Sequence, residues 1–246
     1  MPNRSLFPRL IFAVSTLELG ILALIYGDFA MVWQPVPAWV PGRTALAYAA
    51  GVLMILCAVG IFYPRTKQLA TQVLFAYTIL WAALKLPPLL TAPQTEGNWL
   101  GLAELTVIVA GAWTLWAGQS PSPARNLRAA QILLGLSLLP IGISHIVYAK
   151  DTADLIPAWI PFHPFWAYFT GAAHIAAGLA LLFSVIPSLA ATLEAVMLTL
   201  FGLLVWLPRI LAAPMTRLPW TAFWITGIIA GATWLVATST PQTPQP

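Results

Sequence analysis

Eight long apolar runs dominate this 246-residue chain and limit what it can fold into. Their approximate cores are 8–27, 44–63, 68–90, 99–118, 128–148, 164–186, 189–212 and 219–238. Each run is close to the roughly 20 residues that cross the hydrocarbon core of a bilayer. An unpaired backbone amide in lipid costs several kcal/mol, so each run must form a helix there. We therefore predict an all-α polytopic membrane protein with eight transmembrane helices.

Composition agrees with a lipid environment and excludes several functions. The chain is 60% hydrophobic and 7% charged, which leaves too little charge to cover a water-soluble surface. Its net charge of +4 comes from Lys and Arg at the ends of the apolar runs, so we expect contact with lipid and not with nucleic acid. Cys57 is the only cysteine, which excludes an intrachain disulfide or a CxxC redox pair. The first run could pass for a signal peptide, but Glu18 interrupts it, and we expect a retained helix.

The chain also repeats itself. It reads PAWVPGRTALAYAAGVLMILCAVGIF at 37–62 and PAWIPFHPFWAYFTGAAHIAAGLALLF at 157–183. Further matches lie about 120–122 residues apart and include Gly20 with Gly142, Tyr26 with Tyr148, Gly51 with Gly171, LPPLLTAP at 86–93 with LPRILAAP at 207–214, Trp99 with Trp220, and Trp113 with Trp234. A fixed period of this kind indicates duplicated units. We predict two tandem four-helix bundle repeats, 1–120 and 121–238, followed by a polar, proline-rich, disordered tail at 239–246.

Four crossings return the chain to its starting side, so the two repeats point the same way and form a parallel repeat. One side of the membrane would hold Arg4, Arg9, Arg65, Lys67, Arg125 and Arg128. The other side would hold Arg43, Lys150, Arg209 and Arg217, together with Asp28, Glu96, Asp151 and Asp154. This charge bias favours cytoplasmic N- and C-termini, in a bacterial cytoplasmic membrane, with the PAW loops outside.

Three segments carry a resemblance to a known family. They are HIVYAKDTADLIPAWIPFHPFWAYFTGAAHIAAGLALL at 145–182, LPRILAAP at 207–214 with its downstream Trp220, and NWLGLAEL at 98–105. These segments resemble the DoxX-like integral membrane proteins. The resemblance implies a four-helix unit in each half and a link to redox complexes, since the family takes its name from a membrane subunit of a thiosulfate:quinone oxidoreductase. It also implies redox-complex subunits as partners and a quinone as ligand. Family members often carry His before the Leu-Pro pair of the third helix, where this chain has Lys85 and Trp206.

Lys85 and Glu104 form the first candidate site. Both are expected a turn or two from the outer end of adjacent antiparallel helices, and their counterparts in the second half are Trp206 and Ile225. Because a lone buried charge is expensive, the joint absence of both charges favours an ion pair between helices. The alternatives are a pair that lines a substrate or proton site, and a Lys85 that reaches the headgroups.

Glu18 is predicted near the middle of the first helix, where a carboxylate is most expensive. It is therefore either a functional acid or a protonated side chain with a hydrogen bond inside the bundle, for example near Ser15.

His145 and His174 lie on adjacent helices and could bind haem or a metal. Their predicted depths differ by several ångströms and no second histidine pair exists, so hydrogen-bonded structural histidines are favoured over haem. His163 is expected in the outer loop. Glu194 is expected to be structural, near a positively polarised helix N-terminus.

The outer face is the fourth candidate site and the one that the sequence favours most. Trp39, Trp159 and Arg209 lie there, with the two PAW loops. Such a face could form a wet, aromatic-rimmed mouth for an amphipathic molecule such as a quinone headgroup, although Trp and Pro are also common at any membrane interface.

Three functions remain open from the sequence. The first is an accessory or anchor subunit of a quinone-linked redox complex. The second is a transporter or carrier of a small or lipid-like molecule, against which stands the lack of matched helix breaks, since only Pro140 interrupts a helix core. The third is a non-catalytic structural membrane protein. No Walker loop, GxSxG or HExxH motif indicates a known enzyme chemistry, and whether the chain is an enzyme stays open.

Overall fold

The computed structural model describes residues 6–239, and every regular element in that range is helical. The elements are α1 (Leu6–Tyr26), η1 (Met31–Trp33), α2 (Arg43–Gly60), α3 (Lys67–Ala83), α4 (Leu86–Thr91), α5 (Glu96–Ala117), α6 (Pro123–Val147), α7 (Ala149–Leu155), α8 (His163–Leu182), α9 (Pro187–Phe201), η2 (Gly202–Trp206), α10 (Leu207–Ala212) and α11 (Arg217–Ser239). Arg4 and the predicted disordered tail beyond Ser239 lie outside the described residues.

Eight helical stretches within this range are long and apolar enough to cross a membrane. Six are single helices, and the other two are composite: α3 with α4 spans 67–91, and α9 with η2 and α10 spans 187–212. All eight coincide with the predicted apolar runs to within a few residues. The prediction of an all-α polytopic membrane protein is confirmed.

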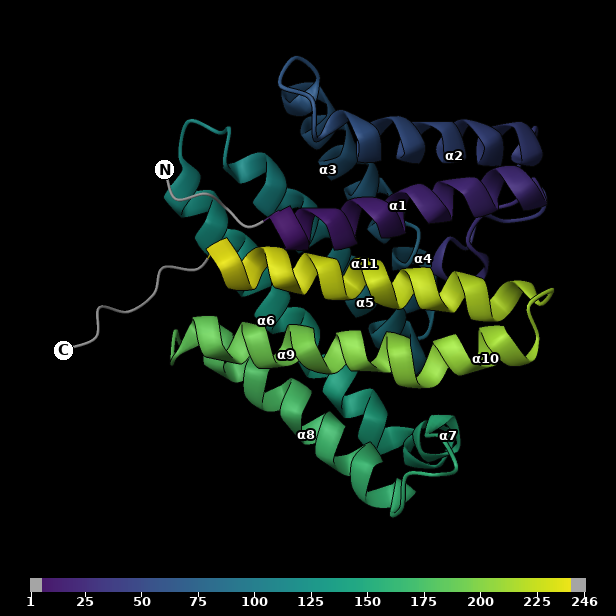
Figure 1. The fold of residues 1–246 in the computed structure, drawn as a ribbon, viewed down its shortest axis with the longest axis vertical. Helices are drawn as coiled ribbons and strands as arrows, with labels where there is room; N and C mark the ends of the chain where they lie inside the picture. The colour runs from purple at the N-terminus through teal and green to yellow at the C-terminus, as the bar shows by residue number, and fades with distance from the viewer. Residues whose placement is uncertain (1–5, 240–246) are drawn as a thin grey trace.

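The helices run roughly side by side, with both described chain ends at one end of the bundle (Figure 1). We call this the terminal end. The opposite, distal end carries the connections 27–42, 92–95, 148–162 and 213–216, of which 27–42 and 148–162 are the longest between the spans. The connections at the terminal end are short, at 61–66, 118–122 and 183–186.

The last helix of each predicted half, α5 and α11, forms the centre of the bundle. These two helices pack against each other and are the most deeply buried spans. On one side, α1, α2 and α3 complete a ring of helices with them, and on the other side α6, α8 and α9 do the same. As a result, α1 packs against α11 and α6 packs against α5, so each half supplies helices to the surroundings of the other.

Glycines let neighbouring helices approach to backbone contact at equivalent places in the two rings. A Cβ atom at Gly20 of α1 would lie 2.7 Å from the carbonyl oxygen of Gly51 in α2. A Cβ atom at Gly142 of α6 would lie 2.5 Å from the carbonyl oxygen of Gly171 in α8. No side chain fits at such distances, so small residues set the spacing of both helix pairs.

Two expectations about helix breaks are wrong. Pro140 does not interrupt its helix, because α6 continues through it from Pro123 to Val147. Membrane helices tolerate proline when neighbouring groups accommodate the freed carbonyl. By contrast, the two composite spans are both irregular just before their Leu-Pro motif. The first has a turn at 84–85 between α3 and α4, and the second has a π-helical segment, Gly202–Trp206, between α9 and α10.

Candidate functional site: a cavity between α8 and α9

A cavity of about 940 Å³ lies within the ring formed by α5, α6, α8, α9 and α11. Most of its wall is apolar, with Leu, Ile, Ala, Phe and Trp side chains from all five helices. It extends from Tyr148, Thr152 and Trp206 near the distal end to Ala180 and Leu189 nearer the terminal end. Its size is within the range of sites that hold a drug-sized molecule.

The cavity opens sideways between α8 and α9. These helices meet at the 183–186 turn and diverge towards the distal end (Figure 1). Phe169 of α8 and Leu193 and Leu200 of α9 line the cavity and are also exposed on the surface of the chain. In a membrane this surface faces the acyl chains, so a lipophilic molecule could enter from the bilayer.

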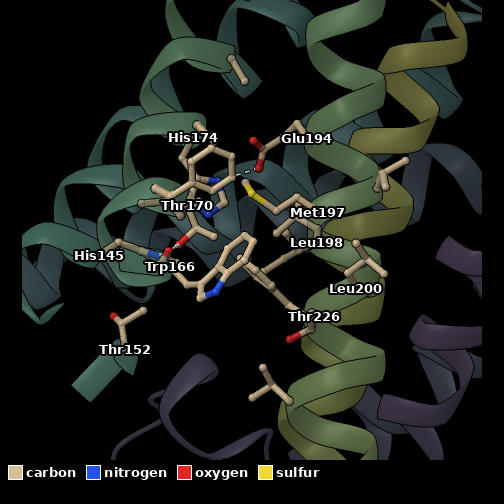
Figure 2. A pocket seen from close by; sticks show the side chains of 18 of the residues that line it. His145, Thr152, Trp166, Thr170, His174, Glu194, Met197, Leu198, Leu200 and Thr226 are labelled. Carbon is tan, nitrogen blue, oxygen red and sulfur yellow. Dashed lines mark hydrogen bonds and ion pairs between the residues drawn. The ribbon is translucent and has the colours of Figure 1, made fainter. Parts of the chain in front are cut away.

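A buried pair of polar residues lies inside this apolar wall. Nδ1 of His174 in α8 lies 2.7 Å from Oε1 of Glu194 in α9, and the two side chains are 0% and 1% exposed (Figure 2). Nε2 of His174 and Oε2 of Glu194 are buried and have no hydrogen-bond partner among the described residues. Buried polar groups are nearly always satisfied, so these two atoms stand out.

His145 completes the polar patch from α6. Its Nδ1 lies 2.8 Å from Oγ1 of Thr170, and its ring contacts the ring of His174 edge to face, with centroids 4.9 Å apart (Figure 2). We refer to His145, His174 and Glu194 as the polar patch. Phe201 packs within 6.0 Å of both imidazole rings.

The two histidines differ in depth at the backbone, as expected, but their rings meet, and the geometry of antiparallel helices explains why. His145 and His174 each lie three residues from the Gly142–Gly171 contact, on opposite sides of it, or about 4.5 Å away along the axis. Side chains lean towards the N-terminus of their own helix, and the two helices run in opposite directions. Both imidazoles therefore lean towards the contact and meet.

The polar patch does not have the geometry of a metal site. No group of three or more His, Cys, Asp or Glu residues among residues 6–239 is placed to hold an ion. The two imidazole rings touch each other, so an iron atom could not lie between them as arranged.

Glu104 of α5 also lines the cavity, but it does not form the expected ion pair with Lys85. Oε2 of Glu104 accepts a hydrogen bond of 2.8 Å from Nε1 of Trp33, and Nζ of Lys85 donates to the carbonyl oxygen of Val32 at 2.6 Å. The connection between α1 and α2 therefore separates the two partners that the sequence placed face to face.

The connection between α1 and α2 enters the ring formed by α1, α2, α3, α5 and α11 and fills its distal end. The amide oxygen of Gln34 accepts from the Ala30 backbone N–H at 2.8 Å, and its amide nitrogen donates to the Tyr77 hydroxyl at 2.8 Å. Nε1 of Trp81 donates to the Trp33 carbonyl oxygen. The segment 29–34 thus occupies space that is open in the ring around the cavity.

Asp28 links the connection between α1 and α2 to two helices. It forms ion pairs with Arg43 at the start of α2 and with Arg217 at the start of α11, the latter at 3.1 Å. Burial raises the pKa of Asp28, but hydrogen bonds from Arg217, the Phe29 N–H and Arg43 outweigh it, so the pKa lies below its ordinary value. The charged form of Asp28 is therefore the one that the fold stabilises.

The remaining predicted residues lie elsewhere. Glu18 is half-buried on α1 and has no hydrogen bond or ion pair among residues 6–239, so the hydrogen bond near Ser15, given as an example of one of the two alternatives, is not present. Trp39 and Trp159 are 81% and 72% exposed at the distal end. Arg209 lies over the ring of Trp206 and donates to the carbonyl oxygens of Leu155 and Val205. None of these four candidates is part of the cavity wall as described.

The surroundings of Glu194 differ from those that its sequence position indicates. It was expected to serve the N-terminus of its helix, but it points at His174 instead. A usable signal is its position, because His174 lies eleven residues before Val185 in the turn and Glu194 lies nine residues after it. Residues at similar distances from a hairpin turn reach similar depths in the membrane.

The fold and the cavity together define an all-α polytopic membrane protein with a laterally open, mostly apolar pocket that carries one buried polar patch. No family model, no curated protein and no solved structure matches the chain.

Proposed function

We propose that this protein takes a lipophilic molecule with a polar, ring-shaped head from the bilayer into the cavity between α8 and α9. The observation that carries the proposal is the cavity itself, which is large, apolar and bordered by lipid-facing side chains, with His145, His174 and Glu194 in its wall. Pockets of this kind use apolar area for affinity and a few polar groups for orientation.

A quinone is the representative ligand of this class. Its ring would suit the aromatic surroundings of Phe201 and Trp166, and its oxygens would meet the polar patch. The resemblance to DoxX-like proteins supports the same class and suggests the setting, an accessory or anchor subunit of a quinone-linked redox complex in a bacterial cytoplasmic membrane.

Purification in mild detergent tests the proposal. Mass spectrometry of the extracted small molecules should find a quinone or a related ring lipid with the wild-type protein, together with any partner subunits. Ala173→Trp fills the cavity wall and should abolish the bound molecule, whereas Ala49→Trp, on an exposed position of α2, should retain it. Equal recovery from all three proteins would show that the molecule is bulk lipid.

A carrier of a small or lipid-like molecule is the second candidate, and the matched irregularities favour it. Both composite spans are interrupted directly before a Leu-Pro motif, and π-helical segments often mark functional sites. Proton-coupled uptake into liposomes that is lost in Glu18→Gln would support this function. Absence of both uptake and a bound molecule would leave a structural role.

We also infer that the chain consists of two duplicated four-helix units in one orientation. Two pairs of contacts support this inference at the spacing of the repeat. Gly20 meets Gly51 as Gly142 meets Gly171. Nε1 of Trp99 donates to the Pro93 carbonyl oxygen at 2.8 Å, and Nε1 of Trp220 donates to that of Pro214 at 2.8 Å.

The charge bias of the loops supports termini in the cytoplasm. A tag at Ser122 is then expected on the same side of the membrane as the N-terminus. Finding the two on opposite sides would remove the duplicated topology.

A further inference from the structure

The polar patch contains two buried atoms that nothing in the described chain satisfies. Nε2 of His174 and Oε2 of Glu194 have no hydrogen-bond partner, although both residues line a cavity large enough for a ligand. Leaving such an atom buried and unpaired is unfavourable. A bound molecule that hydrogen-bonds to Nε2 of His174 would remove this cost.

The surrounding hydrogen bonds fix where the protons of His145 lie. The Thr170 hydroxyl has one proton, and it donates that proton to the carbonyl oxygen of Trp166 at 2.8 Å. Oγ1 of Thr170 therefore accepts at the 2.8 Å contact with Nδ1 of His145, which must carry the hydrogen. In a neutral imidazole this leaves Nε2 of His145 as an acceptor.

Glu194 fixes the proton of His174 in the same way. A carboxylate accepts hydrogen bonds only, so at 2.7 Å it holds the hydrogen of His174 on Nδ1. Nε2 of His174 then presents a lone pair.

The imidazoles of the polar patch therefore present acceptor nitrogens to the cavity, and both of their N–H hydrogens are already used in hydrogen bonds. Hydroxyl donors in the cavity wall, such as Thr152 and Thr226, lie away from the two imidazoles (Figure 2). A ligand oxygen that reaches this patch must bring its own hydrogen. The neighbouring Phe201, within 6.0 Å of both imidazoles, favours an aromatic ring as the bearer of that oxygen.

We propose that the polar patch binds a hydroxyl-bearing aromatic ring, whose hydroxyl donates to Nε2 of His174, and that it therefore prefers the hydroquinone form of a quinone to the oxidised form. This inference rests on the proposed function and adds the redox state of the ligand. An oxidised quinone has only carbonyl acceptors, which would face the acceptors of the patch. Glu194 is a positioning residue here, since it acts through His174.

The test compares two forms of one probe. A decylbenzohydroquinone and the matching decylbenzoquinone are titrated into the wild-type protein in nanodiscs, under anaerobic conditions, by calorimetry. We expect the hydroquinone to bind at least about tenfold more tightly than the quinone. Its hydroxyl would donate to the imidazole of His174, which is itself bonded to the carboxylate of Glu194, and hydrogen bonds assisted by a charge are stronger than those between neutral groups. The preference belongs to the wild-type protein, so it can be measured even if a variant fails to fold.

Two variants assign the preference to the patch. Glu194→Gln keeps the size of the side chain but removes its charge, and it should reduce the ratio of the two affinities by at least about fivefold while the oxidised form still binds. Thr192→Val removes a hydroxyl from α9 outside the cavity wall and should leave the ratio unchanged.

The outcomes separate the two proposals. Equal binding of both forms, tighter binding of the quinone, or an unchanged ratio in Glu194→Gln would overturn the preference and leave the ligand cavity in place. Failure of both forms to bind the wild-type protein would overturn the proposed function and this inference together.

Discussion

Nδ1 of His174 and Oε1 of Glu194 lie 2.7 Å apart and join α8 to α9 in the interior of the membrane-spanning region. The two helices otherwise diverge from the 183–186 turn, and the cavity opens between them. The hydrogen bond therefore has two consequences. It limits how far the two walls can separate, and it directs Nε2 of His174 away from its partner.

The first prediction concerns the stability that this pair supplies. Glu194→Ala removes the acceptor and leaves Nδ1 of His174 buried and unpaired. We expect a loss of about 1.5–3 kcal/mol, the usual range for a hydrogen bond to a charged group. In a chain of this size that corresponds to a fall in melting temperature of roughly 2–4 °C per kcal/mol, measurable by differential scanning fluorimetry.

A double-mutant cycle is the control for this prediction. His174→Phe combined with Glu194→Leu replaces both polar partners with apolar side chains, and it should cost less than the sum of His174→Phe and Glu194→Leu alone. Strictly additive shifts in melting temperature would mean that the pair makes no energetic contribution.

The second prediction concerns Glu104, which accepts a hydrogen bond from Trp33. Glu104→Leu leaves the Trp33 N–H beside the cavity without an acceptor. The free energy of unfolding should fall by the roughly 1–3 kcal/mol that an unsatisfied buried donor costs, and the melting temperature should fall with it. Glu104→Gln keeps an acceptor oxygen in place and should cost much less. If the two variants have the same melting temperature, well below that of the wild type, the charge of Glu104 and not its hydrogen bond stabilises the fold. A direct ion pair with Lys85 would give this result.

The third prediction concerns the close approach of α6 and α8. Gly142→Ala places a Cβ atom 2.5 Å from the Gly171 carbonyl oxygen, so the helices must separate. We expect a cost of about 1–3 kcal/mol from overpacking. The same substitution at Gly202 meets only atoms at 3.8 Å or more and should be neutral or slightly stabilising. Melting temperatures of the two variants should therefore move apart, and equal shifts would refute the contact.

The fourth prediction is a pH dependence from Asp28. Its ion pairs with Arg43 and Arg217 hold its pKa below the ordinary value of 3.8. A group with a lowered pKa in the folded state contributes stability above its unfolded pKa and loses it as the pH falls through the folded pKa. The difference in melting temperature between the wild type and Asp28→Asn should be constant above about pH 5 and shrink below about pH 4. A difference that is independent of pH would contradict the ion pairs.

The sequence predicts the fold well because its dominant constraint is local. A run of about 20 apolar residues must be a helix in lipid whatever surrounds it. The predicted core at 99–118 corresponds to Glu96–Ala117, and the one at 44–63 corresponds to Arg43–Gly60. The interruption at Leu84 and Lys85 cannot be predicted from the sequence, because the apolar pattern continues through it.

The site was harder to predict because it depends on how helices rotate and tilt. His145 and His174 were identified as candidates, but their contact follows from side chains that lean in opposite directions on antiparallel helices. The similar depths of Lys85 and Glu104 in the membrane predict an ion pair, yet Val32 and Trp33 lie between the two side chains. A connecting loop that enters the bundle leaves no periodic pattern in its sequence.

The central claim is that the cavity between α8 and α9 binds a lipophilic ring molecule. The most direct test is a calorimetric titration of a decylbenzoquinone into the wild-type protein, Ala173→Trp and Ala49→Trp in nanodiscs. The account predicts saturable binding to the wild type and Ala49→Trp, and at least about tenfold weaker binding to Ala173→Trp, a difference of about 1.4 kcal/mol or more. Non-saturable partitioning that is the same for all three proteins would contradict it.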